Sequence, residues 1–70
     1  MNQHKIADFI RLRRIYLSIN QEDLAELAGV TTKTIYLVEK GTGNPAISTL
    51  EKILNVLGLE FSVHVKKTDK

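Results

Sequence analysis

Residues 21–40 read QEDLAELAGVTTKTIYLVEK, and their pattern indicates how this chain folds. Its apolar residues recur at helical spacing on both sides of Gly29, which predicts two short helices joined by a tight turn. A helix-turn-helix needs a small residue where the helices cross, a glycine in the turn and apolar residues that lock the helices together. The stretch supplies each of them: a small Ala25, the turn residue Gly29, and the locking residues Leu24, Val30, Ile35 and Val38.

The sequence on either side of this stretch predicts two further helices. Residues 3–17 carry apolar side chains at helical spacing, and so do residues 47–57. Asn20 begins a capping-box pattern at the start of the second helix, and Thr31 can cap the third. The glycines, asparagine and proline of GTGNP (residues 41–45) predict a loop before the fourth helix.

Beyond Gly58 the period of the sequence changes from that of a helix to that of a strand. Residues 59–66, LEFSVHVK, alternate apolar and polar side chains, which predicts one half-buried strand. A lone strand leaves backbone groups unpaired, so the simplest solution is antiparallel pairing with the same strand of a second copy. The alternative is that the strand folds back onto its own helices. The apolar residues expected at the dimer contact are Leu59, Phe61, Val63 and Val65.

Composition narrows the classes of function. The 70 residues make one small domain with no cysteine, and His4 and His64 lie far apart, so we expect neither a disulfide nor a metal site. A net charge of +2 permits an anionic partner without requiring one. The sequence has no long apolar run and no signal peptide, which predicts a cytoplasmic protein without a membrane partner. It also lacks a paired acid and base or a nucleophile set, so we expect no enzyme activity and no cofactor.

Four sequence features carry a resemblance to a known family. They are Arg14, NQEDLAELAGV, TIxxVEKG and GNPAISTLEKIL. On these features, over about residues 9–58, the chain resembles the phage-repressor/Cro-like (Xre) helix-turn-helix family. The strand after Gly58 resembles a narrower branch, the HipB-like antitoxin repressors. The resemblance implies a mostly α, lambda-repressor-like bundle of four helices with one C-terminal β-strand that pairs across a dimer.

The same resemblance implies a function. It indicates a homodimeric repressor that binds a palindromic operator in double-stranded DNA, acting as the antitoxin of a HipAB-like pair with a HipA-like toxin as partner. Two alternatives stay open: a stand-alone Xre-type repressor, and a protein-interaction module with weak DNA affinity. The expected domains are a helix-turn-helix DNA-binding domain at 1–58, a dimerisation strand at 59–66 and a frayed tail at 67–70.

Roles for single residues also follow from the resemblance. The base-contacting residues it implies are Thr31, Thr32, Lys33, Tyr36 and Leu37. The phosphate-contacting residues are Asn20, Gln21, Lys40, Thr42, Gly43 and Asn44. Arg14 and Glu39 match a structural salt bridge between the first and third helices.

Elementary chemistry is compatible with these roles, and it also leaves alternatives. A helix N-terminus favours a phosphate, and Lys33 can donate to the O6 and N7 atoms of guanine. Leu37 stands where many relatives have a polar residue, so contact with a thymine methyl group is the expectation there. The alternatives are a solvated helix start at residues 31–33, and a protein-binding apolar patch at Tyr36 and Leu37.

Two further departures from the family pattern affect helix ends. Ser18 stands where many relatives have glycine, which implies either an ordinary turn or a locally strained backbone. Ala46 replaces a capping serine or aspartate, so the fourth helix is expected to lack about 1 kcal/mol of capping.

Overall fold

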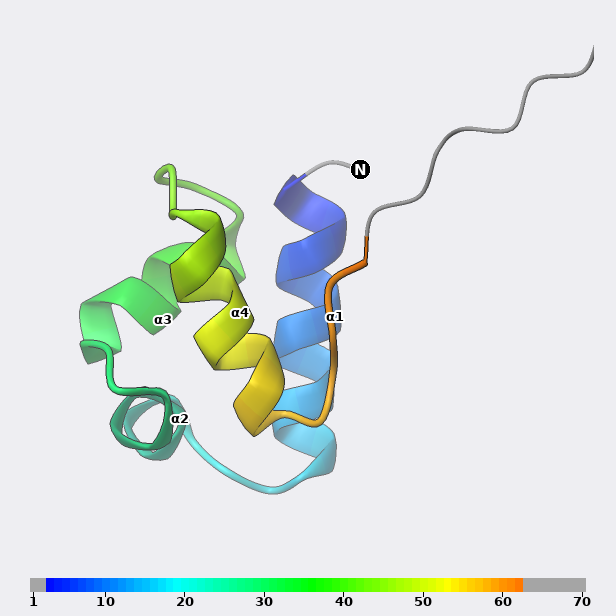
Figure 1. Ribbon diagram of the computed structural model, residues 1–70. Coiled ribbons are helices and arrows are strands. Elements are labelled where there is room, and N and C mark those ends of the chain that lie inside the picture. The colour runs from blue at the N-terminus through cyan, green and yellow to red at the C-terminus, as the bar shows by residue number, and fades with distance from the viewer. Residues whose placement is uncertain (1–2, 63–70) are drawn as a thin grey trace, which may run out of the picture.

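The structure, a computed structural model, describes residues 3–62, and side chains from Lys5 onward. The helices of this part of the chain are α1 (Gln3–Tyr16), α2 (Gln21–Ala28), α3 (Thr32–Lys40) and α4 (Ile47–Val56). They match the four predicted helices, with α1 and α4 each ending one residue earlier than expected. Figure 1 shows α3 and α1 at opposite sides of the view, with α2 below α3. The predicted mostly α bundle is confirmed.

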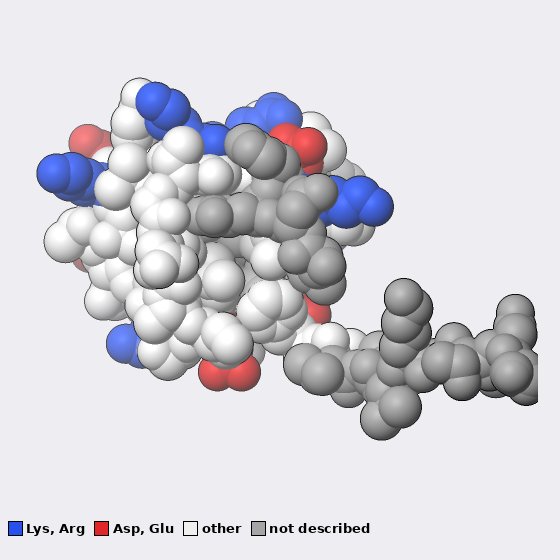
Figure 2. All heavy atoms as spheres, turned by 90° about the horizontal axis from the view of Figure 1, so that it is seen from above, with Lys and Arg blue, Asp and Glu red and all other residues white. Residues whose placement is uncertain are grey.

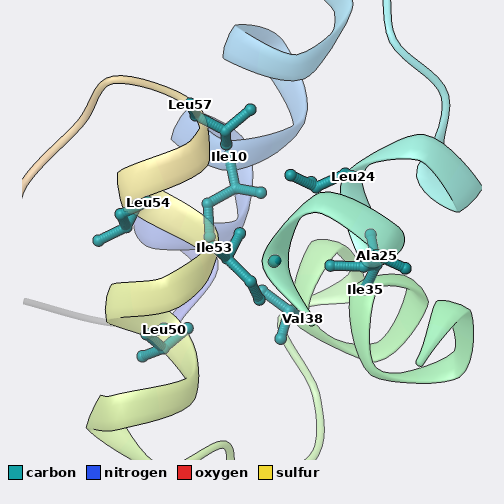
Figure 3. Close-up of a cluster of buried hydrophobic side chains, with 10 residues drawn as sticks. Ile10, Leu24, Ala25, Ile35, Val38, Leu50, Ile53, Leu54 and Leu57 are labelled. Atoms are coloured by element: carbon teal, nitrogen blue, oxygen red, sulfur yellow. The ribbon is translucent and has the colours of Figure 1, made fainter. Parts of the chain in front are cut away.

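A single apolar core joins the helices. Every helix supplies one completely buried side chain, and the residue that follows α4 supplies a fifth: Ile10, Leu24, Ile35, Ile53 and Leu57. Figure 3 shows these side chains converging between α4 and the α2–α3 pair. The helix α3 packs against both α1 and α2, and α2 also packs against α4. Since burial of one such side chain stabilises a fold by about 1.5–3 kcal/mol, this cluster holds the helix-turn-helix in place.

The turn between α2 and α3 depends on a left-handed residue. Gly29 has φ 72°, its N–H donates to the carbonyl of Glu26, and the N–H of Val30 donates to that of Ala25. These two bonds satisfy carbonyls that the helix end would otherwise leave unpaired. A side chain at this φ costs free energy, which explains the glycine.

The end of α1 uses the same pair of bonds without a glycine. Ser18 has φ 60°, its N–H donates to the carbonyl of Ile15, and the N–H of Ile19 donates to that of Arg14. The sequence left open whether Ser18 forms an ordinary turn or has a strained backbone. The structure shows the strained, left-handed backbone. Ser18 is the one residue other than glycine with a positive φ among residues 3–62.

Replacing Ser18 with glycine should stabilise the fold. Removing the side chain relieves about 1–2 kcal/mol of left-handed strain, and the greater freedom of glycine in the unfolded chain offsets part of it. We expect a net gain of roughly 0.5–1 kcal/mol in the free energy of unfolding, measured by urea denaturation. Ser48→Gly, inside α4, is the control and should give no gain. A Ser18→Gly variant no more stable than the parent would contradict the assignment of strain.

The start of α4 lacks a side-chain cap. Ala46 occupies the capping position, and it makes no side-chain hydrogen bond there. The carbonyl of Ala46 still accepts from the N–H groups of Thr49 and Leu50, so the helix begins without the extra contact that serine or aspartate would give. The predicted place of Ala46 at the helix start is confirmed, and the energetic loss of about 1 kcal/mol stays a prediction.

The segment after α4 runs back along the bundle. Figure 1 shows it rising beside α1. Leu59 and Phe61 are half-buried against the core, whereas Glu60 and Ser62 are exposed, so the predicted alternation is present. Within the described chain, residues 59–62 form neither a helix nor a strand. The remaining positions of the predicted strand, Val63 and Val65 among them, and the predicted tail lie outside the described residues.

Candidate nucleic-acid interface

The α2–α3 pair is rigidly held on its inner side. Ala25 and Ala28 of α2 are buried where the two helices meet, and Val38 of α3 is buried beside Ile35. Val30, in the turn, is half-buried against the same cluster. Because side chains on one face of α3 are fixed in this way, its opposite face has a defined direction in space.

The start of α2 is capped by the side chains of Asn20 and Asp23. Asn20 Oδ1 accepts from the N–H of Asp23 at 2.7 Å, and the N–H of Asn20 donates to Asp23 Oδ2 at 3.4 Å. This is the capping box that the sequence pattern indicated. Gln21 lies in the first turn of α2, where backbone N–H groups have no carbonyl of the same helix to bind. Such a turn can accept an anion.

The start of α3 is exposed. Thr31 caps it, because its hydroxyl oxygen accepts from the N–H of Thr34 at 3.1 Å and lies 2.9 Å from the Thr34 hydroxyl. The cap that the sequence predicted at Thr31 is confirmed, and it engages the hydroxyl group of a residue that the resemblance also places at the bases. Thr32 and Lys33 follow on the surface. Together they expose one hydroxyl group and one ammonium group at the start of α3.

One turn further along α3, an aromatic ring and a cation lie together. The Lys40 Nζ atom is 5.2 Å from the centre of the Tyr36 ring, a cation–π contact, and Tyr36 is 49% exposed. Leu37 differs from both. It is half-buried and lines a cavity of about 170 Å³ together with Asn44 and Pro45 of the following loop.

The loop after α3 is tied to that helix. The carbonyl of Leu37 accepts from the N–H of Thr42 at 3.1 Å. Gly43 has φ 78°, and an added Cβ atom there would lie 3.9 Å from the Leu37 Cβ atom. Thr42, Gly43 and Asn44 are all exposed. The structure therefore brings the three predicted phosphate-contacting loop residues to the end of α3, and it gives Leu37 a packing role beside them.

A hydrogen-bonded ion pair connects α1 to α3. The Arg14 Nε atom lies 2.6 Å from Glu39 Oε2, and Arg14 Nη2 lies 2.9 Å from Glu39 Oε1. The Glu39 side chain is only 4% exposed. Two further bonds complete the network: Gln21 Nε2 donates to Glu39 Oε1, and Arg14 Nη1 donates to the carbonyl of Ile19. This network fixes the end of α1, the start of α2 and the end of α3 relative to one another.

The carboxylate of Glu39 also shifts the pKa of Arg14. Its hydrogen bonds and its negative charge raise the pKa of Arg14, while burial lowers it in part. A pKa raised on folding adds stability below the unfolded pKa, and this is lost only as the pH passes the folded value. Both values are strongly alkaline, so Arg14 stays charged throughout the range in which the protein can be studied.

Some of the predicted site residues are exposed on α3, whereas the side chain of Gln21 is bonded within the chain. Thr32, Lys33, Tyr36 and Lys40 lie together on α3, exposed or against one another. The Gln21 side chain instead binds Glu39, which leaves the backbone of the first turn as the part of Gln21 that can contact an anion. The Gln21–Glu39 bond joins residues 18 positions apart, and no local pattern in the sequence indicates it.

Positive charge is dispersed over one face of the molecule. On the face shown in Figure 2, Lys and Arg side chains lie at several separate places around the rim, with a broad uncharged surface between them. The described part of that face therefore carries no dense basic patch. Among the described residues, no cluster of His, Asp or Glu could hold a metal ion, and no helix is long and apolar enough to cross a membrane.

Comparison with known proteins agrees with this geometry. The sequence profile of the helix-turn-helix family matches residues 4–63. The chain belongs to the Xre-like helix-turn-helix family. The match covers α1 to α4 and continues into the segment after α4, so the family pattern includes the residues that pack along the bundle after Gly58.

Three relatives within this family are informative. The HTH-type transcriptional regulator PuuR of Escherichia coli is 40% identical over 52 residues, which are 74% of this chain and 28% of PuuR. An uncharacterized HTH-type transcriptional regulator of Methanothermobacter thermautotrophicus is 43% identical over 73% of this chain and 74% of its own length. The cryptic phage CTXphi transcriptional repressor RstR of Vibrio cholerae is 33% identical over 86% of this chain and 54% of RstR. The chain thus spans little more than a quarter of PuuR.

Proposed function

We propose that this chain is a DNA-binding transcriptional regulator that acts as a repressor and places α3 in the major groove. The observation that carries the proposal is the division of α3 into two faces. Ile35 and Val38 are buried, whereas Thr32 and Lys33 at its start are exposed. In helix-turn-helix proteins the second helix of the unit enters the major groove with its N-terminal residues against the bases. The names of relatives, transcriptional regulators and one phage repressor, support the same function.

The individual contacts in this proposal follow from the side chains. Lys33 donates to guanine, and Thr32 offers a hydroxyl or a methyl group to a neighbouring base. Thr31 contributes mainly its methyl group, because its hydroxyl caps α3. Tyr36 and Lys40 lie one and two turns on, where the groove wall is formed by sugar and phosphate.

The phosphate contacts come from backbone as much as from side chains. The start of α2, at Asn20 and Gln21, is the first contact: the N–H of Gln21 has no carbonyl partner within the helix, while the N–H of Asn20 already donates to Asp23, so Asn20 contributes through its position beside the phosphate. The loop at residues 42–44 is the second. In this proposal Leu37 supports the loop and contributes at most apolar contact to a thymine methyl group, in keeping with its half-buried position.

Operator binding as a homodimer completes the proposal. Two copies paired through residues 59–66 would present two α3 helices to successive major grooves about 34 Å apart on a palindromic operator. We further propose that the chain is the antitoxin of a HipAB-like pair, a role supported by the resemblance of its C-terminal strand pattern to that branch. A stand-alone repressor is the alternative. The relative RstR is named as a transcriptional repressor, which is compatible with either role.

Replacing Lys33 with alanine tests the reading role. We expect selection from a random duplex library to show one base position at which the parent protein prefers guanine and Lys33→Ala does not, with roughly 10–100-fold less discrimination there. Lys52→Ala, an exposed lysine on α4, is the matched control and should leave the selected sequences unchanged. If Lys33→Ala selects the same sequences as the parent, Lys33 does not read a base.

A further inference from the structure

The outward side of α1 carries several large apolar side chains beside the exposed charged residues Lys5 and Asp8. Its inward side holds Ala7, Ile10 and Arg14, which face the core and α3. Half a turn away, where a helix of a small domain normally carries polar residues, four side chains are exposed by 54–75%: Phe9, Leu12, Ile15 and Tyr16. We call these four residues the α1 face. The predicted helix-turn-helix function does not use them.

The α1 face is large enough to need an explanation. Exposures of 54–75% on side chains of this size correspond to roughly 500 Å² of accessible surface. A monomeric protein rarely exposes a larger continuous apolar patch, and patches of this size often bind a partner. Two such faces in contact would bury roughly 1,000 Å² in total, which is the lower limit for a specific interface.

A groove extends this face toward the C-terminal segment. Phe9 lines it from α1, together with Ile6, and Leu54, Leu59 and Phe61 line it from the other side. The volume of this groove is about 230 Å³, and its walls are mainly apolar. A partner that covers the α1 face can therefore also insert a side chain beside Phe9, which adds area to the contact.

We propose that a second copy of this chain covers the α1 face, with the two α1 helices packed antiparallel about a two-fold axis at Leu12. In a two-fold contact the same residues serve both partners, so the two positions of each pair must suit one another. Antiparallel helices centred on Leu12 bring Phe9 opposite Ile15, an apolar pair. They also bring Asp8 opposite Tyr16, whose hydroxyl can donate to a carboxylate. Asp8 is exposed and has only a 3.4 Å pair with Arg11 in the single chain.

The proposed contact is compatible with the other surfaces of the chain. The α1 contact also leaves α3 accessible, because the α1 face points away from the side of α1 that packs on α3. The inference therefore does not rest on DNA binding. It is also separate from strand pairing, and where both contacts form, the chain assembles beyond a dimer.

A single cysteine at the proposed axis tests the geometry. The chain has no cysteine, so Leu12→Cys introduces one thiol per copy, and on the axis the two thiols meet. On mild oxidation we expect about tenfold or more cross-linked dimer for Leu12→Cys than for Ile47→Cys, whose parent residue is equally apolar and 65% exposed on α4. Equal cross-linking of the two variants would overturn the proposal.

Sedimentation equilibrium separates this contact from strand pairing. The double variant Leu12→Glu, Ile15→Glu should weaken self-association about tenfold or more, since it places charges in an apolar contact, while circular dichroism shows an unchanged fold. If His64→Pro abolishes association and the double variant leaves it unchanged, strand pairing alone holds the copies together and the α1 contact is wrong. The base preference conferred by Lys33 is measured independently, so neither result bears on the proposed regulator function.

Discussion

Arg14→Ala is expected to lower the free energy of unfolding by about 3–5 kcal/mol, because it leaves a buried carboxylate without its cation. Glu39 is almost wholly buried and receives two hydrogen bonds from Arg14 at 2.6 and 2.9 Å. The remaining donor, Gln21, is neutral and cannot compensate the charge. In a domain of this size the change should lower the melting temperature by roughly 15 °C or more.

Thermal and urea denaturation measure this effect. Two controls show whether it comes from the unpaired buried charge. Arg11→Ala breaks an exposed pair with Asp8 and should cost less than about 1 kcal/mol. The double replacement Arg14→Met, Glu39→Leu removes both charges and should recover most of the loss, because the penalty comes from the unpaired charge. A melting curve of Arg14→Ala equal to that of the parent would show that the ion pair is not structural.

Ile35→Ala is expected to cost about 2–5 kcal/mol, the range for emptying a well-packed core position. Ile35 is completely buried and lies on the inner face of α3, opposite the exposed residues at the helix start. The variant should therefore also loosen α3 and weaken DNA binding more than its stability loss alone explains. The cavity is large because an isoleucine side chain loses three carbon atoms when it becomes alanine.

An isoleucine at the surface provides the matched comparison. Ile47→Ala, at the start of α4, changes the same atoms at a position that is 65% exposed, so its effect on stability should stay within about 0.5 kcal/mol. Chemical denaturation of the two variants side by side measures the difference. Similar losses for both would mean that α3 is not anchored through Ile35.

Local signals predicted the helices well. Asn20 with Asp23 gave the start of α2, and Gly29 its end, since both act through bonds between residues three to five positions apart. The apolar spacing of Leu24, Ile35 and Ile53 likewise predicted a core that the structure contains. Such patterns are informative because helix geometry brings residues of fixed spacing to one face.

The details of the candidate site depended on contacts that local patterns do not contain. The bond from Gln21 to Glu39 and the packing of Leu37 against the following loop arise only once the helices are assembled. Ser18 shows another limit. The sequence left its backbone conformation open, and the need for two hydrogen bonds at the end of α1 determines it. The exposed apolar face of α1 was also missed. Apolar residues lie on several sides of α1, so their spacing alone does not show that Phe9 faces away from the core.

The salt dependence of binding to a duplex of random sequence shows whether the chain contacts DNA phosphates. A helix-turn-helix that contacts several phosphates displaces their counterions, so the logarithm of the binding constant should fall linearly with that of the salt concentration. With about four phosphates contacted per copy, from α2, α3 and the loop at residues 42–44, a dimer contacts about eight, and we expect a slope of roughly −7. A slope near zero, or no binding at low salt, would contradict the account, since it would leave the exposed start of α3 without a nucleic-acid partner.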